Sequence, residues 1–465
     1  MLRARVRALV NREYGIVDAS LLLLAAYLGS AMLGAVRQIL LSARFGGGDE
    51  LSAFLAAAKL PDTLFTLIAG GAITNAMVPV IIVARRKSES SAWRVVELTL
   101  TALLVTVAAL TAMGIVFAPW LVRTLLAPGF DEPTAELTTR LTRLLLFQPL
   151  MLAAGSVAVA KLNSQARFFL PALAILIQNV SEIAGIGLSW IVPSIGIYGP
   201  ALGVLGGVLL QALVLLPALR HDNHWPRLRW DPGDAQLRQV VRLLIPNSLL
   251  LASSYLGGVI ELAFASLADE PNAIPALVNA WLLVGLPVRL IGTAAGQAAF
   301  PRLAAAGARG DWELFRTLIR RTAAIPALIT ALGIPFFLVF GQTVVDLLFV
   351  HGEYTSADGD LTYQLVRIFT LGLPFYAVTE VITRGMVSLR DTRTPLLTNV
   401  AQLVIRAGLM ALFIDSVGLT IIPWSLALTA IAEALILGFL LWRRVERGVE
   451  QMQSAAVVAN QFRDD

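Results

Sequence analysis

Residues 33–48 read LGAVRQILLSARFGGG and place an arginine, Arg37, in a run whose other side chains are mostly apolar or small. A guanidinium near the middle of a bilayer costs at least about 2.5–3.5 kcal/mol on insertion scales. Such a charge therefore needs an oppositely charged partner, a water-filled cavity or a ligand. To decide between these three, we ask whether the run belongs to a membrane span and which residues surround Arg37.

The whole chain has the composition of a membrane protein. Of its 465 residues, 57% are hydrophobic and only 14% are charged, and the mean hydropathy is +0.75. A soluble chain carries roughly 25% charged residues. There is no cysteine, which excludes disulfides and thiolate metal sites. His221 and His224 lie in a polar stretch without an evident third metal ligand, so we expect neither a bound metal nor a cofactor.

Apolar runs recur along the chain at lengths that suit membrane helices, each of which needs about 20 mostly apolar residues. On this criterion the sequence predicts an all-α polytopic membrane protein with about twelve transmembrane helices. A basic arm, MLRARVRALVNR (1–12), precedes the first run without a small-residue cleavage site, so we expect an uncleaved first helix. The predicted spans are 17–43, 51–84, 95–120, 137–160, 168–191, 196–219, 241–267, 273–300, 317–342, 361–386, 395–416 and 420–442.

The basic residues predict the orientation of these spans. With a cytoplasmic N-terminus, 27 of the 36 lysines and arginines fall on the inner face, and the opposite loops are short or acidic, as in PGFDEP and HGEYTSADGD. This positive-inside asymmetry predicts that both termini are cytoplasmic. Because the positive charge is spread over seven inner segments and forms no continuous stripe, nucleic acid is not an expected partner.

The sequence also repeats itself at a long interval. GGAITNAMVP (70–79) resembles GTAAGQAAFP (292–301), and LTTRLTR (137–143) shares L-T-x-x-L-x-R with LTYQLVR (361–367), at offsets of 222 and 224. Two matches near one offset predict a duplication. We therefore expect two six-helix bundles related by a pseudo-twofold axis along the membrane normal, with a substrate site between them. The predicted division is an N-terminal bundle at 1–220, a cytoplasmic linker at 221–240, a C-terminal bundle at 241–445 and a cytoplasmic tail at 446–465.

Charged residues inside the predicted spans are the candidate functional residues. Arg37 and Lys59 are expected at similar depths, about 10 Å and 12 Å from the outer surface at 1.5 Å per residue. Asp62 follows Lys59 at i, i+3 and can pair with it. In one interpretation Lys59 and Asp62 neutralise each other while Arg37 snorkels to the headgroups. In the other, Arg37 and Lys59 line a cationic cavity that attracts an anion, beside a kink at Pro61.

The second half contains further charges within predicted spans. Arg289 is too deep to reach either surface easily, Arg406 and Glu433 are candidates for a structural pair, and Glu182 and Glu261 have no obvious partner.

The sequence contains no Walker loop and no nucleophile elbow, which favours a transporter over an enzyme.

Several segments, in order, resemble one known family. They are RQILLSARFGGGDELSAFLAAAKLP (37–61), GGAITNAMVPV (70–80), LLAPGF (125–130), LFVHGEYTSAD (348–358) and SLRDTRTP (388–395). Together they resemble the MurJ/MviN-type lipid II flippases of the multidrug, oligosaccharidyl-lipid and polysaccharide exporter superfamily. The resemblance implies a protein of the bacterial cytoplasmic membrane that moves an undecaprenyl-pyrophosphate-linked peptidoglycan precursor outward by alternating access, driven by membrane potential or an ion gradient.

The resemblance also implies a set of site residues. The family's cavity arginine matches Arg37, and its Lys-Leu-Pro matches Lys59 to Pro61; the position of another family arginine holds Leu282, with Arg289 seven residues further on the same face of an α-helix. The candidate substrate-binding residues are Arg37, Lys59, Asp62 and Arg289, with Pro61 as a hinge. The alternatives are flipping of another polyprenyl-linked oligosaccharide, a cation-coupled drug antiporter and a membrane scaffold without transport.

Overall fold

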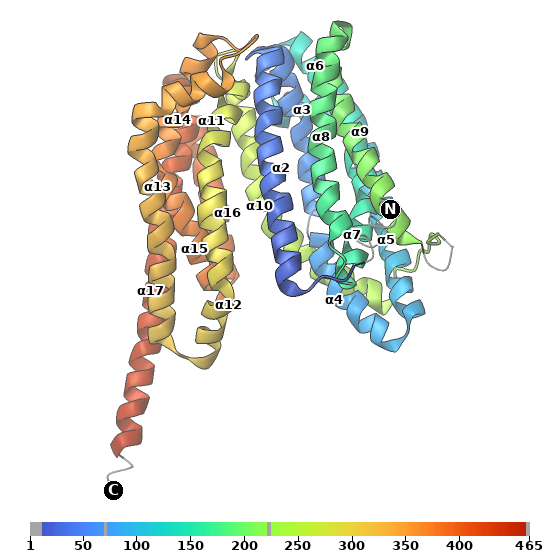
Figure 1. Ribbon diagram of the computed structural model, residues 1–465. Coiled ribbons are helices and arrows are strands. Elements are labelled where there is room, and N and C mark those ends of the chain that lie inside the picture. Colours follow the sequence, from blue (N-terminus) through green and yellow to red (C-terminus); the bar gives the residue numbers. More distant parts are fainter. Residues whose placement is uncertain (1–11, 69–71, 221–224, 462–465) are drawn as a thin grey trace. The chain divides into compact units, whose positions relative to one another are not determined.

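The structure is a computed structural model that describes residues 12–68, 72–220 and 225–461 (Figure 1). All regular elements in these ranges are helices, which satisfy their own backbone N–H and C=O groups where lipid offers no hydrogen-bond partner. The predicted all-α class is confirmed.

The chain divides into two compact units. The first comprises Met1–Leu267 with His351–Tyr354, and the second comprises Ala268–Val350 with Thr355–Asp465. Helix α10 (Ala235–Ser266) belongs to the first unit by its packing, where it contacts α3 and α4. The division at 221–240 expected from the repeat stays a prediction.

Besides α10, the first unit contains eight α-helices and three short helical turns among its described residues. The helices are α2 (Ile16–Phe45), α3 (Asp49–Ile68), α4 (Ala72–Lys87), α5 (Glu89–Leu121), α6 (Glu132–Leu145), α7 (Phe147–Ser164), α8 (Phe169–Ile191) and α9 (Tyr198–Leu215), while the turns are η1 (Val122–Leu126), η2 (Pro193–Ile195) and η3 (Leu216–Leu219). Every predicted span up to residue 267 coincides with one of these helices or with two in succession.

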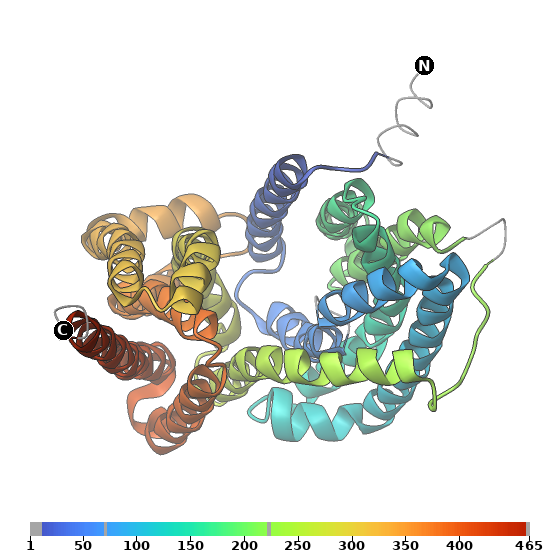
Figure 2. The same ribbon diagram turned by 90° about the horizontal axis from the view of Figure 1, so that it is seen from below.

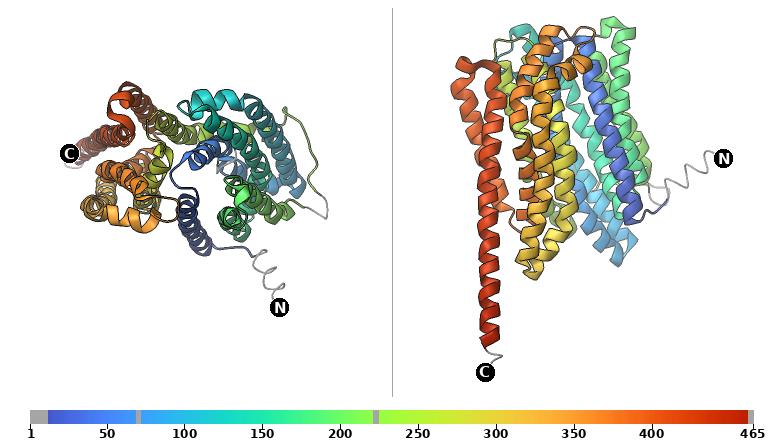
Figure 3. Two further views of the ribbon diagram at one scale, coloured as in Figure 1. Left: turned by 90° about the horizontal axis from the view of Figure 1, so that it is seen from above. Right: turned by 60° about the vertical axis from the view of Figure 1, so that its left-hand side comes forward.

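The second unit is a bundle seen nearly end-on in Figure 2, in gold to red. Its elements are α11 (Ala273–Pro287), η4 (Val288–Thr293), α12 (Ala294–Arg309), α13 (Trp312–Phe349), α14 (Ser356–Leu371), α15 (Leu373–Ser388), α16 (Arg393–Val417), η5 (Gly418–Thr420) and α17 (Ile421–Gln461). Helix α17 runs on past the predicted span as one long helix (Figure 3). Within the described ranges, eight helical stretches are long and apolar enough to cross a membrane, or nine if α14 and α15 form one span bent by 48°. The count of twelve stays a prediction.

Helix breaks recur at matching places in the two units. The predicted span 137–160 breaks at Leu146 between α6 and α7, and the span 361–386 breaks at Gly372 between α14 and α15. The repeated arginines Arg143 and Arg367 lie on the first helix of each broken pair. This order of elements agrees with the predicted duplication.

A seam of small residues joins α8 to α9. Four-residue steps place Ser181, Gly185 and Ser189 on α8 against Gly199, Gly203 and Gly207 on α9. A Cβ atom added at Gly185 would lie 2.5 Å from the carbonyl oxygen of Gly199 and 2.7 Å from the Cα atom of Gly203. Small residues at this spacing let helix backbones approach closely in a membrane. The seam therefore fixes the position of α8.

The described part of the predicted linker, from residue 225, lies along α5. The buried Glu97 carboxylate accepts a hydrogen bond from the Arg227 N–H at 2.9 Å and pairs with the Arg229 guanidinium at 2.8 Å. Arg94 pairs with Asp234, the N-cap of α10, at 3.0 Å. Burial alone would raise the pKa of the Asp234 carboxyl, but backbone N–H groups of α10 and the Arg94 guanidinium hold that pKa below its usual range. These contacts set where α10 begins.

We predict that Gly185→Ala destabilises the protein by about 1–3 kcal/mol, because the added methyl group must push two backbones apart. Gly187→Ala is the matched control on the same helix, since a Cβ atom there meets nothing within 4 Å, and alanine favours helix by about 1 kcal/mol over glycine. Thermal unfolding in detergent measures both variants. Equal melting temperatures for the two would contradict the close α8–α9 contact.

Candidate polar site in the first unit

The Arg37 side chain on α2 turns toward α8. Its Nη1 atom lies 2.5 Å from the Oε2 atom of Glu182, whose side chain is 7% exposed, while that of Arg37 is 34% exposed. A snorkelling arginine would extend along the lipid toward the headgroups and would not contact a buried carboxylate. The snorkelling interpretation is therefore wrong, and Glu182, which had no partner evident from the sequence, is the partner of Arg37.

Polar contacts repeat along α2 and α8 on either side of this pair. Asn179 donates to the Ser30 hydroxyl at 2.9 Å, and Arg44 donates to the backbone carbonyl of Ser189 at 3.2 Å. Ser30, Arg37 and Arg44 are spaced by seven residues, so they share one face of α2. The helix pair therefore carries a polar seam within an otherwise apolar surrounding.

The ion pair leaves part of the Arg37 guanidinium unused. A guanidinium has five N–H donors, and the buried Nε of Arg37 meets no acceptor in the described part of the chain. On the other side of the pair, Glu182 also accepts a 3.4 Å hydrogen bond from Gln178. Arg37 is thus held in place by one carboxylate and can still donate to a second anion.

Asp62 and Lys59 do not form the expected i, i+3 ion pair in the described structure. Asp62 on α3 instead accepts a hydrogen bond from Gln148 of α7 at 3.0 Å. The Lys59 ammonium passes beside Gly258 of α10, where an added Cβ atom would lie 2.5 Å from Nζ. The carboxylate that contacts Arg37 is that of Glu182 and not that of Asp62.

These four charged groups act on one another. The Asp62 carboxyl lies in the electrostatic field of Glu182, Lys59 and Arg37. Two cations and two carboxylates give a formal charge of zero, so an incoming anion must compete with carboxylates that are already present. The cationic cavity stays a prediction.

Pro61 lies inside α3, and the helix continues through it to Ile68. Proline lacks the N–H that would continue the hydrogen-bond ladder, and nearby the Thr63 hydroxyl donates to the carbonyl oxygen of Lys59 at 2.7 Å. The hinge at Pro61 stays a prediction.

Arg289 belongs to the second unit and lies in the π-helical turn η4, directly after Pro287. Its side chain is exposed and makes no ion pair with any residue that the structure describes. A π-helical turn holds more residues than an α-helical turn. The π-helical turn shifts Arg289 somewhat from the position that a regular α-helix would give it relative to Leu282, and its role as a substitute for the family arginine stays a prediction.

The second unit also buries a polar group that the sequence only partly revealed. Glu433 on α17 accepts a hydrogen bond from Thr398 at 3.2 Å and lies in the electrostatic field of Arg406 and of Glu380 on α15. Glu380 was missed. Glu380 lies within the predicted span 361–386, and an acidic residue inside an apolar span is the signal that could have identified it.

Long apolar helices, a buried ion pair with spare donors and further buried charges in the second unit define a class: a polytopic membrane transporter. The comparisons with known proteins identify the family. The model of the lipid II flippase MurJ family matches residues 41–461, and the chain belongs to that family. It is a multi-pass protein of the inner membrane.

Individual relatives agree with this assignment. The chain is 27% identical over 444 residues to a probable lipid II flippase MurJ of Bdellovibrio bacteriovorus, covering 91% of this chain and 81% of that protein. It is 25% identical to the lipid II flippase MurJ of Burkholderia cenocepacia, covering 91% and 82%.

Two solved structures share the fold. A lipid II flippase MurJ in an inward closed conformation matches with a TM-score of 0.79 and 22% identity, covering 90% of this chain and 87% of that chain. An inward-facing multidrug resistance transporter of the MATE family matches with a TM-score of 0.80 and 16% identity, covering 90% and 96%. The second match extends the fold to the wider superfamily.

We predict that Glu182→Gln destabilises the protein, because it leaves the Arg37 charge uncompensated beside α8. Removing one partner of a buried ion pair costs about 3–5 kcal/mol of stability. Because one third of the Arg37 side chain is exposed, we expect a loss at or below the lower end of that range. The double variant Arg37→Gln, Glu182→Gln should recover most of this loss. The measurement is a double-mutant cycle: unfolding in detergent of the wild type, the two single variants and the double variant. Purely additive effects of the two substitutions would mean that the side chains do not interact.

Proposed function

We propose that this protein flips lipid II from the inner to the outer leaflet of the bacterial cytoplasmic membrane. The family match over residues 41–461 and the relatives named as lipid II flippases support this assignment. Its partners are then the undecaprenyl-linked lipid and the bilayer. The substrate crosses without a covalent change, so the protein acts as a transporter and not as an enzyme.

The observation that carries the proposal is the half-used guanidinium of Arg37. A pyrophosphate offers several anionic oxygens, and a guanidinium binds such groups by planar, charge-assisted, bidentate hydrogen bonds. Arg37 is oriented in advance by Glu182, has a buried Nε without an acceptor in the described chain and is about one-third exposed, at 34%. The substrate pyrophosphate takes the free donors and weakens the hold of Glu182.

The other candidate residues take supporting roles in this proposal. Lys59 adds a second positive charge near Arg37, and Asp62 limits the net charge so that the anion can also leave. Arg289 of the second unit, which makes no ion pair with the residues that the structure describes, is a further candidate for substrate binding, and Pro61 is a hinge. Transport is driven by membrane potential or an ion gradient and needs no cofactor.

We predict that Arg37 is needed for flipping even where its charge is not needed for folding. The Glu182→Gln protein keeps the guanidinium and should flip lipid II. Adding Arg37→Gln to it removes the cation without leaving a buried carboxylate, and should lower the rate at least tenfold. The flipping rate of Arg37→Lys should lie between that of the wild type and that of the double variant, because the lysine ammonium is a point charge and cannot form the two parallel hydrogen bonds of a guanidinium.

The measurement is complementation of a host depleted of its own lipid II flippase, together with surface-exposed lipid II and the amount of folded protein. Normal flipping by the well-folded double variant would refute the role of Arg37. If the wild-type chain folds but never complements, the substrate is another polyprenyl-linked oligosaccharide or a drug, and the lipid II assignment fails.

We predict further that both termini are cytoplasmic, because 27 of the 36 basic residues lie on the face that this orientation places inside. A reporter that is active only in the cytoplasm should work when fused after Arg444 and fail when inserted within 131–136. Reversed activities at the two sites would contradict the orientation.

A further inference from the structure

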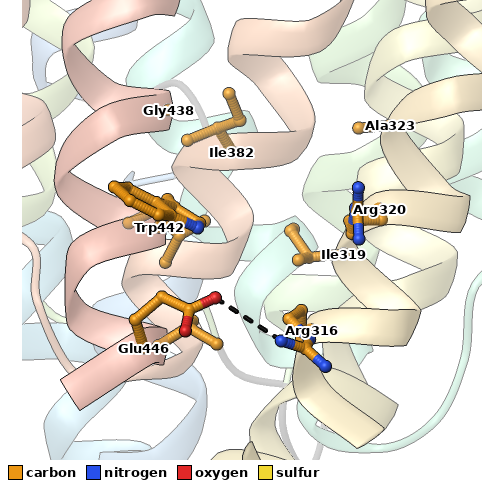
Figure 4. Close-up of a pocket in the computed structure, with 10 residues that line it drawn as sticks. Arg316, Ile319, Arg320, Ala323, Ile382, Gly438, Trp442 and Glu446 are labelled. Atoms are coloured by element: carbon orange, nitrogen blue, oxygen red, sulfur yellow. Dashed lines mark hydrogen bonds and ion pairs between the residues drawn. The ribbon is translucent and has the colours of Figure 1, made fainter. Parts of the chain in front are cut away.

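A cavity of about 280 Å³ lies within the second unit, between α13, α15 and α17 (Figure 4). Arg316 and Arg320 approach it from α13, Trp442 and Glu446 from α17, and Ile382 from α15. All of its lining residues belong to the second unit, so it shares none with the first-unit site around Arg37. Two arginines against one glutamate make the charged lining positive by one unit.

The lining changes from charged to apolar along the helices. Arg316 lies opposite Glu446 at 3.4 Å, and one turn further along, Arg320 and Trp442 occupy the next row, because residues four apart share a helix face. Further still, Ala323 and Gly438 bring almost no side-chain volume. The cavity is thus charged at one end, aromatic in the middle and apolar at the other end.

This gradient coincides with the edge of the membrane. The apolar run of α17 ends at Trp442 and is followed by two arginines, while α13 becomes apolar only after Arg320 and Arg321. Tryptophan and arginine at such a position are typical of the headgroup level of a bilayer. The charged end therefore lies at the headgroups and the apolar end lies among the acyl chains.

Arg320 is the arginine most available to a ligand. Nearby basic residues are engaged: Arg444 pairs with Asp391 at 2.9 Å, and Arg443 lies over the Phe439 ring at 4.5 Å. Arg320 makes no ion pair in the part of the chain that the structure describes, and Arg316 shares only one long contact with Glu446.

We propose that this cavity binds one anionic phospholipid, with its phosphate on Arg320 and Arg316 and one acyl chain between Ala323, Ile382 and Gly438. Basic pockets between transmembrane helices near the cytoplasmic surface bind lipid headgroups in this way. The Trp442 indole lies at the junction of head and tail, where an N–H donor and an apolar ring both find partners. With the predicted orientation, the lipid belongs to the inner leaflet.

The test is lipid binding to the purified, full-length protein by native mass spectrometry, with titrations of dioleoyl phosphatidylglycerol and of neutral dioleoyl phosphatidylcholine. We expect one phosphatidylglycerol to bind at least tenfold more tightly than phosphatidylcholine. Arg320→Gln and Arg316→Gln together should remove the preference. Arg321→Gln is the matched control, because Arg321 neighbours Arg320 but does not line the cavity, and it should leave the preference unchanged.

A second variant tests the apolar end without altering any charge. A Cβ atom at Gly438 meets only the Cδ1 atom of Ile382, at 3.6 Å, so Gly438→Leu is tolerated by the helix and fills the cavity. It should weaken phosphatidylglycerol binding at least fivefold. Equal binding of both lipids to the wild type, or equal losses in Arg321→Gln and in the double arginine variant, would overturn the proposal, since binding would then reflect diffuse surface charge.

Discussion

The ion pair between Arg37 and Glu182 is the constraint on which the first unit depends. A guanidinium and a carboxylate within apolar helices each need a partner, and the 2.5 Å contact supplies one to both. The contact also requires α8 to lie at a fixed distance and rotation relative to α2. The glycine seam between α8 and α9 fixes this position, because the close backbone contact at Gly185 leaves α8 little room to move.

Functional demands explain why the unit keeps this arrangement. A hydrophobic pair of similar volume would pack as well and would avoid the desolvation of two charges. In the proposed function, an ion pair with one unused guanidinium edge does something that an apolar pair cannot: it keeps an anion-binding group ready while preventing it from binding too strongly. Asp62 and Lys59 extend the same balance, since each positive group near the site has a carboxylate within its field.

The helical fold could be predicted from the sequence, because hydropathy depends on local composition. The sequence also showed that Arg37 needs a partner within a membrane span, but it did not show which one. The partner Glu182 lies 145 residues away, and only the packing of α2 on α8 brings the two together. Likewise, the π-helical turn at Arg289 follows from a local hydrogen-bond shift beside Pro287 that a helical repeat cannot show. The cavity between α13, α15 and α17 is lined by helices that are far apart in the sequence, so the sequence could not reveal it.

In the proposed function, the substrate pyrophosphate and Glu182 compete for Arg37. The most direct measurement is the dissociation constant of undecaprenyl pyrophosphate for purified wild-type, Glu182→Gln and Arg37→Gln proteins at matched ionic strength. Competition predicts that Glu182→Gln binds this lipid more tightly than the wild type and that Arg37→Gln binds it at least tenfold more weakly. Weaker binding by the folded Glu182→Gln protein, or unchanged binding by Arg37→Gln, would contradict the account.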